Sequence, residues 1–141
     1  SLPQDDLIRV LIHETPGLFT LCLKFTDQSI QESYHVSPGQ FNMLHLYGIG
    51  EIPISIVSDP AYSHIIEHTI RIVGRVSSAF SCLSVGDRIG VRGPFGCGWP
   101  VTETRHKDVV IVTGGLGCAP VVSAINYIAQ RRKDYGCRNI V

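Results

Sequence analysis

The feature that most constrains this chain is a series of short stretches, reaching to about Pro100, in which apolar and polar residues alternate. In the clearest stretch, Phe19, Leu21, Leu23 and Phe25 are separated by single polar or small residues. A period of two is typical of a β-strand with one buried face. The other stretches that we predict to be strands are 8–12, 40–47, 52–57, 68–73 and 88–92.

Turn residues separate these stretches. They are Pro16-Gly17, Ser37-Pro38-Gly39, Gly48-Ile49-Gly50, Asp59-Pro60 and Gly86-Asp87. Glycine and proline favour the backbone angles of tight turns. Six short strands with this spacing predict a small antiparallel β-barrel, because closing a sheet on itself removes its exposed edges. One short helix is expected to interrupt the barrel at about 77–83.

The pattern changes after Pro100. Residues 108–113 form a run rich in β-branched apolar side chains, typical of a strand covered on both faces. The glycine-rich segment 114–117 follows, and then a helix is expected with Pro120 near its first position, where a missing N–H is tolerated. Residues 139–141 resemble the start of another strand, so this part predicts a β-α-β unit.

A β-α-β unit of this length is too short to build a parallel sheet covered on both faces. We therefore predict a barrel domain over 1–103 and an incomplete second domain over 104–141. We expect either that the sequence is a piece of a longer protein, or that the second segment packs onto the barrel or onto a neighbouring chain.

Composition excludes several classes of function. Acidic and basic residues balance at 12 each, whereas nucleic-acid binders usually carry a basic excess on one face. No apolar stretch approaches the roughly 18 residues that a membrane span needs, and the polar start of the chain does not resemble a signal peptide. The five cysteines include no C-x-x-C pair, so we predict no metal site and a reducing, cytoplasmic setting.

Six local motifs occur in an informative order. They are Pro38-Gly39-Gln40-Phe41, Ile52-Pro53-Ile54-Ser55, Gly74-Arg75-Val76-Ser77, Val85-Gly86-Asp87, Gly93-Pro94-Phe95-Gly96 and Gly114-Gly115-Leu116-Gly117-Cys118-Ala119-Pro120. Together they resemble the ferredoxin–NADP reductase superfamily. Within it, the chain is most similar to electron-transfer subunits of dihydroorotate dehydrogenase, gamma subunits of cytoplasmic nickel–iron hydrogenases, and the corresponding subunits of anaerobic sulfite reductases.

The resemblance implies a six-stranded antiparallel Greek-key barrel with one short helix, followed by a truncated α/β nucleotide-binding domain. It also assigns a set of flavin-contacting residues. Ile54 would pack against the isoalloxazine ring, and Ser55 would be the catalytic residue that hydrogen-bonds near N5, the atom that accepts hydride. The remaining residues expected to line the flavin are Ile52, Pro53, Thr69, Ile70 and Arg71.

One position departs from the family pattern. The arginine that usually meets the flavin pyrophosphate is Ile52 here, which weakens the expectation of FAD relative to FMN or to no flavin. Arg71 or Arg75 and backbone amides would then hold the phosphate.

The motif Gly74-Arg75-Val76-Ser77 precedes the predicted helix, where first-turn N–H groups bind anions. By resemblance, Gly74, Val76 and the Ser77 hydroxyl would contact the phosphate. The alternative is that Ser77 is an ordinary helix-capping serine.

The glycine-rich segment lacks the third glycine of the standard dinucleotide fingerprint, because Pro120 stands in its place. It matches the motif with which the superfamily binds the nicotinamide nucleotide at a helix N-terminus. The residues expected there are Gly114, Gly115, Leu116, Gly117, Ala119 and Pro120.

The resemblance implies a flavoprotein oxidoreductase subunit that passes hydride from NAD(P)H to FAD and then electrons to a redox partner subunit, as in hydrogenase, sulfite reductase or dihydroorotate dehydrogenase. We expect this chain by itself to hold no iron–sulfur cluster and to be inactive. The alternative is a non-catalytic barrel that docks onto a partner subunit of a redox complex, which Ile52 favours.

Two other patterns suggest different chemistry. His64-Ile65-Ile66-Glu67-His68 spells H-x-x-E-H, which on a helix would indicate a zinc peptidase, but we expect a solvated connection leading into a strand. Cys97 and Cys118 lie close to motif residues, and we expect them to be inert packing residues. Trp99 is expected to cover the hinge between the domains or to be part of the core.

Overall fold

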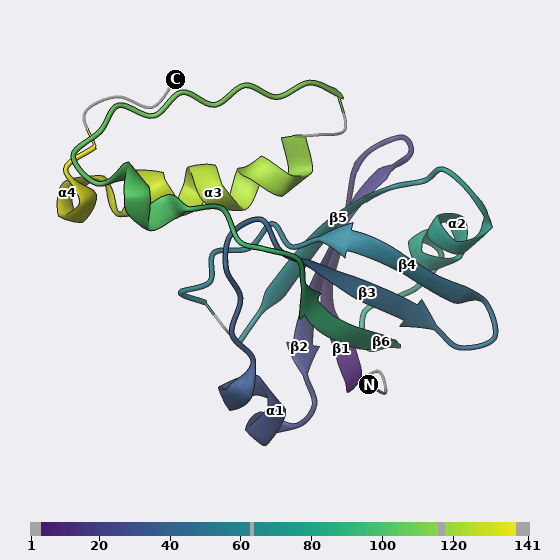
Figure 1. The fold of residues 1–141 in the computed structure, drawn as a ribbon. Helices are drawn as coiled ribbons and strands as arrows, with labels where there is room; N and C mark the ends of the chain where they lie inside the picture. The colour runs from purple at the N-terminus through teal and green to yellow at the C-terminus, as the bar shows by residue number, and fades with distance from the viewer. Residues whose placement is uncertain (1–3, 63, 116–117, 138–141) are drawn as a thin grey trace.

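The computed structural model describes residues 4–62, 64–115 and 118–137. Six strands and two short helices make up its first part (Figure 1). The strands are β1 (Gln4–Thr15), β2 (Leu18–Phe25), β3 (Phe41–Leu46), β4 (Gly50–Ser55), β5 (Ile66–Arg71) and β6 (Arg88–Phe95). The alternating patterns and the turns between them therefore predicted every strand of this part within a few residues.

The strands form one antiparallel sheet in the order β4-β3-β6-β1-β2-β5. Hairpins join β1 to β2 and β3 to β4, and β6 lies between them. The sheet curls so that its two end strands, β4 and β5, meet at a single bridge between Ile56 and His68. Six antiparallel strands were predicted correctly. The closure that was expected is limited, among the described residues, to this bridge.

Nine buried side chains fill the curved sheet and form the main core. They are Ile8, Phe19, Leu21, Leu23, Leu44, Ile70, Phe80, Ile89 and Val91. Phe80 comes from the helix α2 (Arg75–Ser81) and is fully buried. Burying one such side chain contributes about 2–3 kcal/mol, so Phe80 holds α2 against the main core.

Helix α2 begins two residues earlier than the predicted 77–83, because Gly74 is its N-cap and Ser77 lies within its first turn. A second short helix, α1 (Gln28–Ser33), was not predicted. The sequence feature that could have indicated α1 is Asp27. Its carboxylate accepts a hydrogen bond from the Ser29 amide at 2.9 Å, as a helix-capping side chain does.

The chain after Pro100 forms the 3₁₀ turn η1 (Val101–Thr104) and the helices α3 (Cys118–Gln130) and α4 (Arg132–Tyr135). The predicted helix is α3, with Pro120 in its first turn. The prediction of a strand at 108–113 is wrong within the described residues, because the segment is extended but forms only an isolated bridge at Val109. A strand needs a continuous ladder with a neighbour. The strand predicted at 139–141 lies outside the described residues.

A second, smaller core holds this part together, and its buried members are Val101, Ala124, Ile128, Tyr135 and Cys137. Figure 1 shows the extended segment after η1 running along α3 on the side away from the sheet. Within the described part of the chain, no helix is long and apolar enough to cross a membrane.

Candidate functional site

Two of the predicted motifs, 52–55 and 74–77, lie with the predicted residues 69–71 where β4, β5 and α2 come together. Strand β5 leads through Ile72 and Val73 directly into α2, and α2 contacts β4. The Arg75 guanidinium donates a hydrogen bond to the Ile49 carbonyl at 3.1 Å, which ties the start of α2 to the turn before β4. We call this region the β4–β5–α2 wedge and define it by residues 52–55, 69–71 and 74–77.

On β4, side chains alternate between the core and the outer face. Ile52 and Ile54 are partly buried and pack against the main core. Pro53 is exposed, and Ser55 is half-buried at the end of the strand, next to the Ile56–His68 bridge. Since Ile52 packs on the core and carries no charge, it cannot replace the arginine that the family pattern has at this position.

On β5, the three predicted residues have different environments. Ile70 is buried in the main core, so only its backbone can face the wedge. The Thr69 hydroxyl lies 2.8 Å from the Thr20 hydroxyl of the neighbouring strand. Arg71 is exposed at the end of the strand. Of these residues, Arg71 alone offers a positive charge.

At the start of α2, Ser77 has a structural role. Its hydroxyl oxygen accepts hydrogen bonds from the amides of Val73 at 2.9 Å and Gly74 at 3.1 Å, and the residue is 4% exposed. The N-cap is Gly74, and the Ser77 hydroxyl supports the cap from inside the first turn, so it has a structural role close to the alternative interpretation. The position of Ser77 inside the first turn explains why the hydroxyl reaches back to Gly74. A contact of this hydroxyl with a phosphate stays a prediction.

The wedge nevertheless has the groups that a flavin with a phosphate tail requires. The amides of Arg75, Val76 and Ser77 belong to the first turn of α2, where N–H groups lack a carbonyl of the same helix. Open space surrounds the Cα of Gly74, and Arg71 and Arg75 are exposed nearby. Apolar side chains, strand-edge backbone and a cationic helix start fit the flavin at this place.

Behind the wedge lies a buried polar group that the sequence did not reveal as such. His68 is fully buried, and its Nδ1 donates a hydrogen bond to the Ser55 carbonyl at 3.0 Å. Burial lowers the pKa of His68 from 6.5 to about 4, against the opposing effect of the Ser55 and Ile54 carbonyls. The signal was available, because His68 shares the period-two register of Ile66 and Ile70 in β5.

The H-x-x-E-H motif does not form a metal-binding helix. His64 is exposed ahead of β5, whereas His68 lies inside the core, so the two rings do not share one face. Among the residues that the structure describes, no group of three or more His, Cys, Asp or Glu side chains could hold a metal ion.

The glycine-rich motif lies at the start of α3, apart from the wedge. Gly114 and Gly115 are exposed, and Gly115 has a φ of +55° that favours glycine. Ala119 and Pro120 are half-buried in the first turn of α3. Leu116 and Gly117 lie outside the described residues.

Polar contacts at three places tie α3, and Arg131 directly after it, to the barrel. The Trp99 indole N–H donates to the Pro120 carbonyl at 2.9 Å, and the Gly39 amide donates to the Ser123 hydroxyl at 3.1 Å. Trp99 thus covers the junction between the two parts, as one of the two expectations had it. Near the other end of α3, Arg131 pairs with Asp59 through two N–H···O contacts of 3.3 Å, so the second segment packs onto the barrel.

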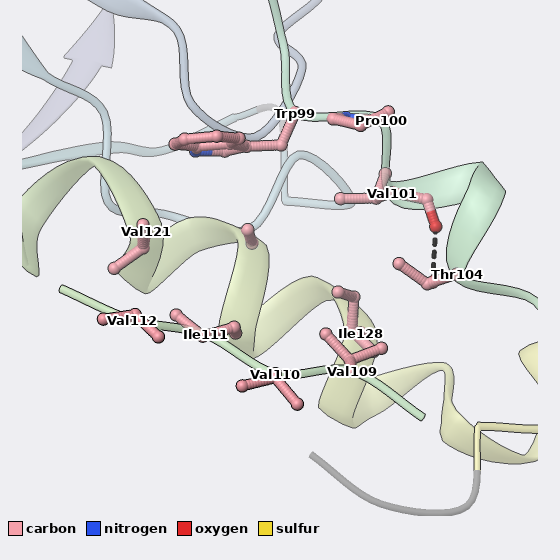
Figure 2. Close-up of a pocket in the computed structure, with 11 residues that line it drawn as sticks. Trp99, Pro100, Val101, Thr104, Val109, Val110, Ile111, Val112, Val121 and Ile128 are labelled. Atoms are coloured by element: carbon pink, nitrogen blue, oxygen red, sulfur yellow. Dashed lines mark hydrogen bonds between the residues drawn. The ribbon is translucent and has the colours of Figure 1, made fainter. Parts of the chain in front are cut away.

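A cleft of about 340 Å³ lies between η1, the extended segment 109–112 and α3. Figure 2 shows Trp99 and Val121 at one end of it and Val101 and Ile128 toward the other. The lining is mostly apolar, and Val110 and Val112 are 70% and 90% exposed. A nucleotide needs well-placed polar partners, so this cleft is unlike a nucleotide site.

Cys97 and Cys118 are exposed free thiols. The expectation that they are packing residues is therefore wrong, because both are in surface segments, next to Gly98 and at the first position of α3.

No family model matches the chain. The chain is 41% identical over 123 residues to sulfhydrogenase 1 subunit gamma of Pyrococcus furiosus, covering 87% of this chain and 41% of that protein. It is 34% identical over 119 residues to the probable dihydroorotate dehydrogenase B (NAD(+)), electron transfer subunit, of Methanocella arvoryzae, covering 84% and 41%. The chain thus spans about two fifths of the length of these curated relatives.

Solved structures agree with the sequence comparison. A ferredoxin NADP+ reductase from Neisseria gonorrhoeae with bound FAD and NADP matches with a TM-score of 0.76 and 28% identity, over 97% of this chain and 55% of that one. The structure of an NADH-dependent reduced ferredoxin-NADP oxidoreductase matches with a TM-score of 0.72 and 23% identity, over 95% and 46%. This second likeness concerns the fold alone.

Proposed function

Because this chain is a relative of sulfhydrogenase gamma subunits and of dihydroorotate dehydrogenase electron-transfer subunits, within the ferredoxin–NADP reductase superfamily, we propose that it is the flavin-binding part of an electron-transfer subunit. The cofactor is FAD, bound in the β4–β5–α2 wedge. When bound, FAD accepts hydride from NAD(P)H and releases electrons singly, chemistry that belongs to the cofactor. The protein's part is to bind, orient and shield it.

The observation that carries the proposal is that 52–55 on β4 lies beside the segment 69–77, which runs from β5 into α2, so that residues assigned to the flavin by resemblance meet in one wedge. Ser55 stands at the end of β4 where the strands meet, and we assign it the position next to the reacting edge of the flavin. Ile54 and Pro53 supply apolar contact, and the backbones of Thr69, Ile70 and Arg71 supply hydrogen bonds.

We place the phosphate end of the flavin at the start of α2, on the side of the wedge away from Ser55. The first-turn amides of α2 and the exposed Arg71 and Arg75 hold the charge that the missing arginine at Ile52 would otherwise hold. Gly74 permits a phosphate to approach because no side chain stands there. Ser77 takes part indirectly, by keeping the Gly74 and Val73 amides in place.

The nicotinamide nucleotide is proposed to bind at the start of α3, along residues 114–120, in the parent protein. The division into domains 1–103 and 104–141 belongs to the same proposal. The electron acceptor is a redox partner subunit of a hydrogenase-like or dihydroorotate dehydrogenase-like complex, as the relatives' names suggest. The apolar cleft of Figure 2 is proposed to be covered by the remainder of the nucleotide-binding domain.

One observation favours a second function, in which the barrel is a non-catalytic docking module. Ile52 packs on the core in place of the family's phosphate-binding arginine, and the Ser77 hydroxyl already accepts hydrogen bonds from the Val73 and Gly74 amides. Both observations favour a barrel that holds no phosphate at the start of α2. Under this alternative the purified chain would not bind a flavin.

A titration with FAD and FMN, followed by the visible absorption and fluorescence of the flavin, distinguishes the two functions. We expect FAD to bind more tightly than FMN, as the likeness to a reductase with bound FAD suggests. A protein that binds neither flavin would support the docking module and overturn the proposal.

The placement of the phosphate is tested at Gly74. Its φ of −175° is open to any residue, and a side chain there meets no atom within 4 Å. Gly74→Asp would place a carboxylate beside the phosphate and weaken FAD at least roughly tenfold by charge repulsion. Gly74→Asn has the same shape without the charge, and its affinity should stay close to that of the unchanged chain. Equal affinities for both variants would show that the phosphate binds elsewhere.

A further inference from the structure

Behind the wedge, a chain of buried hydrogen bonds crosses the barrel from α1 to β4. The Tyr34 hydroxyl, just after α1, contacts the Asn42 side-chain oxygen in β3. The Asn42 amide nitrogen lies 3.3 Å from His68 Nε2, and His68 Nδ1 lies 3.0 Å from the Ser55 carbonyl. Asn42 and His68 are both fully buried.

The partners at the two ends determine the direction of every bond. A carbonyl only accepts, so His68 Nδ1 carries the hydrogen that points to Ser55. The ring is neutral, because burial lowers its pKa, and Nε2 therefore accepts from the Asn42 amide. Burial also raises the pKa of Tyr34, so its hydroxyl stays protonated and donates to the Asn42 oxygen. All three bonds thus run toward Ser55.

Neighbouring residues keep this chain of bonds in place. A Cβ at Gly93 would collide with the Asn42 side-chain oxygen, so the glycine of the motif 93–96 leaves room for the amide. The series of hydrogen bonds ends where β4 and β5 touch. There Ile56 forms a bridge with His68, and the Val57 amide donates to the Glu67 carbonyl at 3.0 Å.

We propose that His68 is a positioning residue of the candidate flavin site, which holds the Ser55 carbonyl and thereby fixes the end of β4 against β5. Bonds that point the same way polarise and strengthen one another, and a rigid backbone at Ser55 keeps its side chain in one orientation. The flavin part of this inference rests on the proposed function. The positioning of β4 against β5 is a property of the chain by itself.

The variant His68→Leu removes both hydrogen bonds, whereas His68→Asn keeps an N–H near the place of Nδ1. We expect His68→Leu to weaken FAD roughly tenfold, the change in dissociation constant that one lost buried hydrogen bond produces, and His68→Asn to recover part of that loss. Ile89→Ala is the matched control: it removes a fully buried side chain of the same core, on β6, and should leave FAD affinity unchanged. Equal affinity in His68→Leu and the unchanged chain would overturn the proposal.

A measurement on the flavin-free protein separates this proposal from the proposed function. Amide hydrogen exchange at Ile56 and Val57 should accelerate in His68→Leu relative to the amides of the β1–β2 hairpin, whereas Ile89→Ala should change both regions alike. If the unchanged chain binds no FAD, the proposed function fails, and this comparison decides the role of His68 alone. Faster exchange at Ile56 and Val57 in His68→Leu would support the positioning role. An unchanged ratio of their exchange rates to those of the β1–β2 hairpin would overturn it.

Discussion

Acidification is expected to destabilise this protein through one residue, His68. The ring is fully buried, and its pKa falls from 6.5 to about 4 on folding because burial disfavours the charged form. Between these two values the unfolded chain binds a proton that the folded chain does not. The stabilising contribution of the neutral ring is therefore complete above pH 6.5 and is lost progressively as the pH falls toward 4.

The size of the effect follows from the same two values. At roughly 1.36 kcal/mol for each pKa unit, the interval from 6.5 to about 4 corresponds to about 3 kcal/mol of unfolding free energy. That is a large fraction of the roughly 5–15 kcal/mol by which a domain is usually stable. Protonation of the ring would also break the bond that the Asn42 amide donates to Nε2.

Urea denaturation at a series of pH values between about 7 and 4.5 measures this loss directly. Carboxylates in water have pKa values of roughly 4, at the lower edge of that window. His68→Gln should be less stable near neutral pH but should lose most of the pH dependence. His64→Gln makes the same chemical change at an exposed position, and it should keep the pH dependence because His68 is still present. Parallel curves for the unchanged chain and His68→Gln would refute the reasoning.

Three further outcomes are expected. Gly39→Ala should lower stability by roughly 1–3 kcal/mol and shift the fluorescence of Trp99, the sole tryptophan, because Gly39 has a φ of +100° and a Cβ there would collide with the indole. Gly17→Ala, with a positive φ but open space around it, should leave the fluorescence unchanged. Arg131→Ala should cost about 2 kcal/mol in urea denaturation, because it leaves the buried Asp59 carboxylate without its charged partner; a cost near zero would contradict this. A thiol reagent should label three exposed cysteines in the native protein and the two buried ones only after denaturation; rapid labelling of all five would show that the two cores are open.

The sequence by itself determined the strands and turns of the barrel, because these depend on neighbours two to four residues apart. The alternation in 19–25 and the glycines at the turns indicated the extent of each strand. The order of the motifs was enough to identify the relatives. The motifs of the wedge were expected to meet around one ligand; the fold does bring them together, and their contacts with a cofactor stay a prediction.

Only the tertiary structure decided what several of these residues do. Ser77 supports the start of α2 because its hydroxyl reaches back to the amide of the N-cap, Gly74. Within the described residues, 108–113 is extended with a single bridge at Val109, because a ladder requires a partner that no local pattern supplies. His68 looked like part of a metal motif and became a buried link between Ser55 and Asn42, 13 and 26 residues away in the sequence. Such roles arise from contacts between distant segments, and a local pattern holds no information about which distant group will be brought beside it.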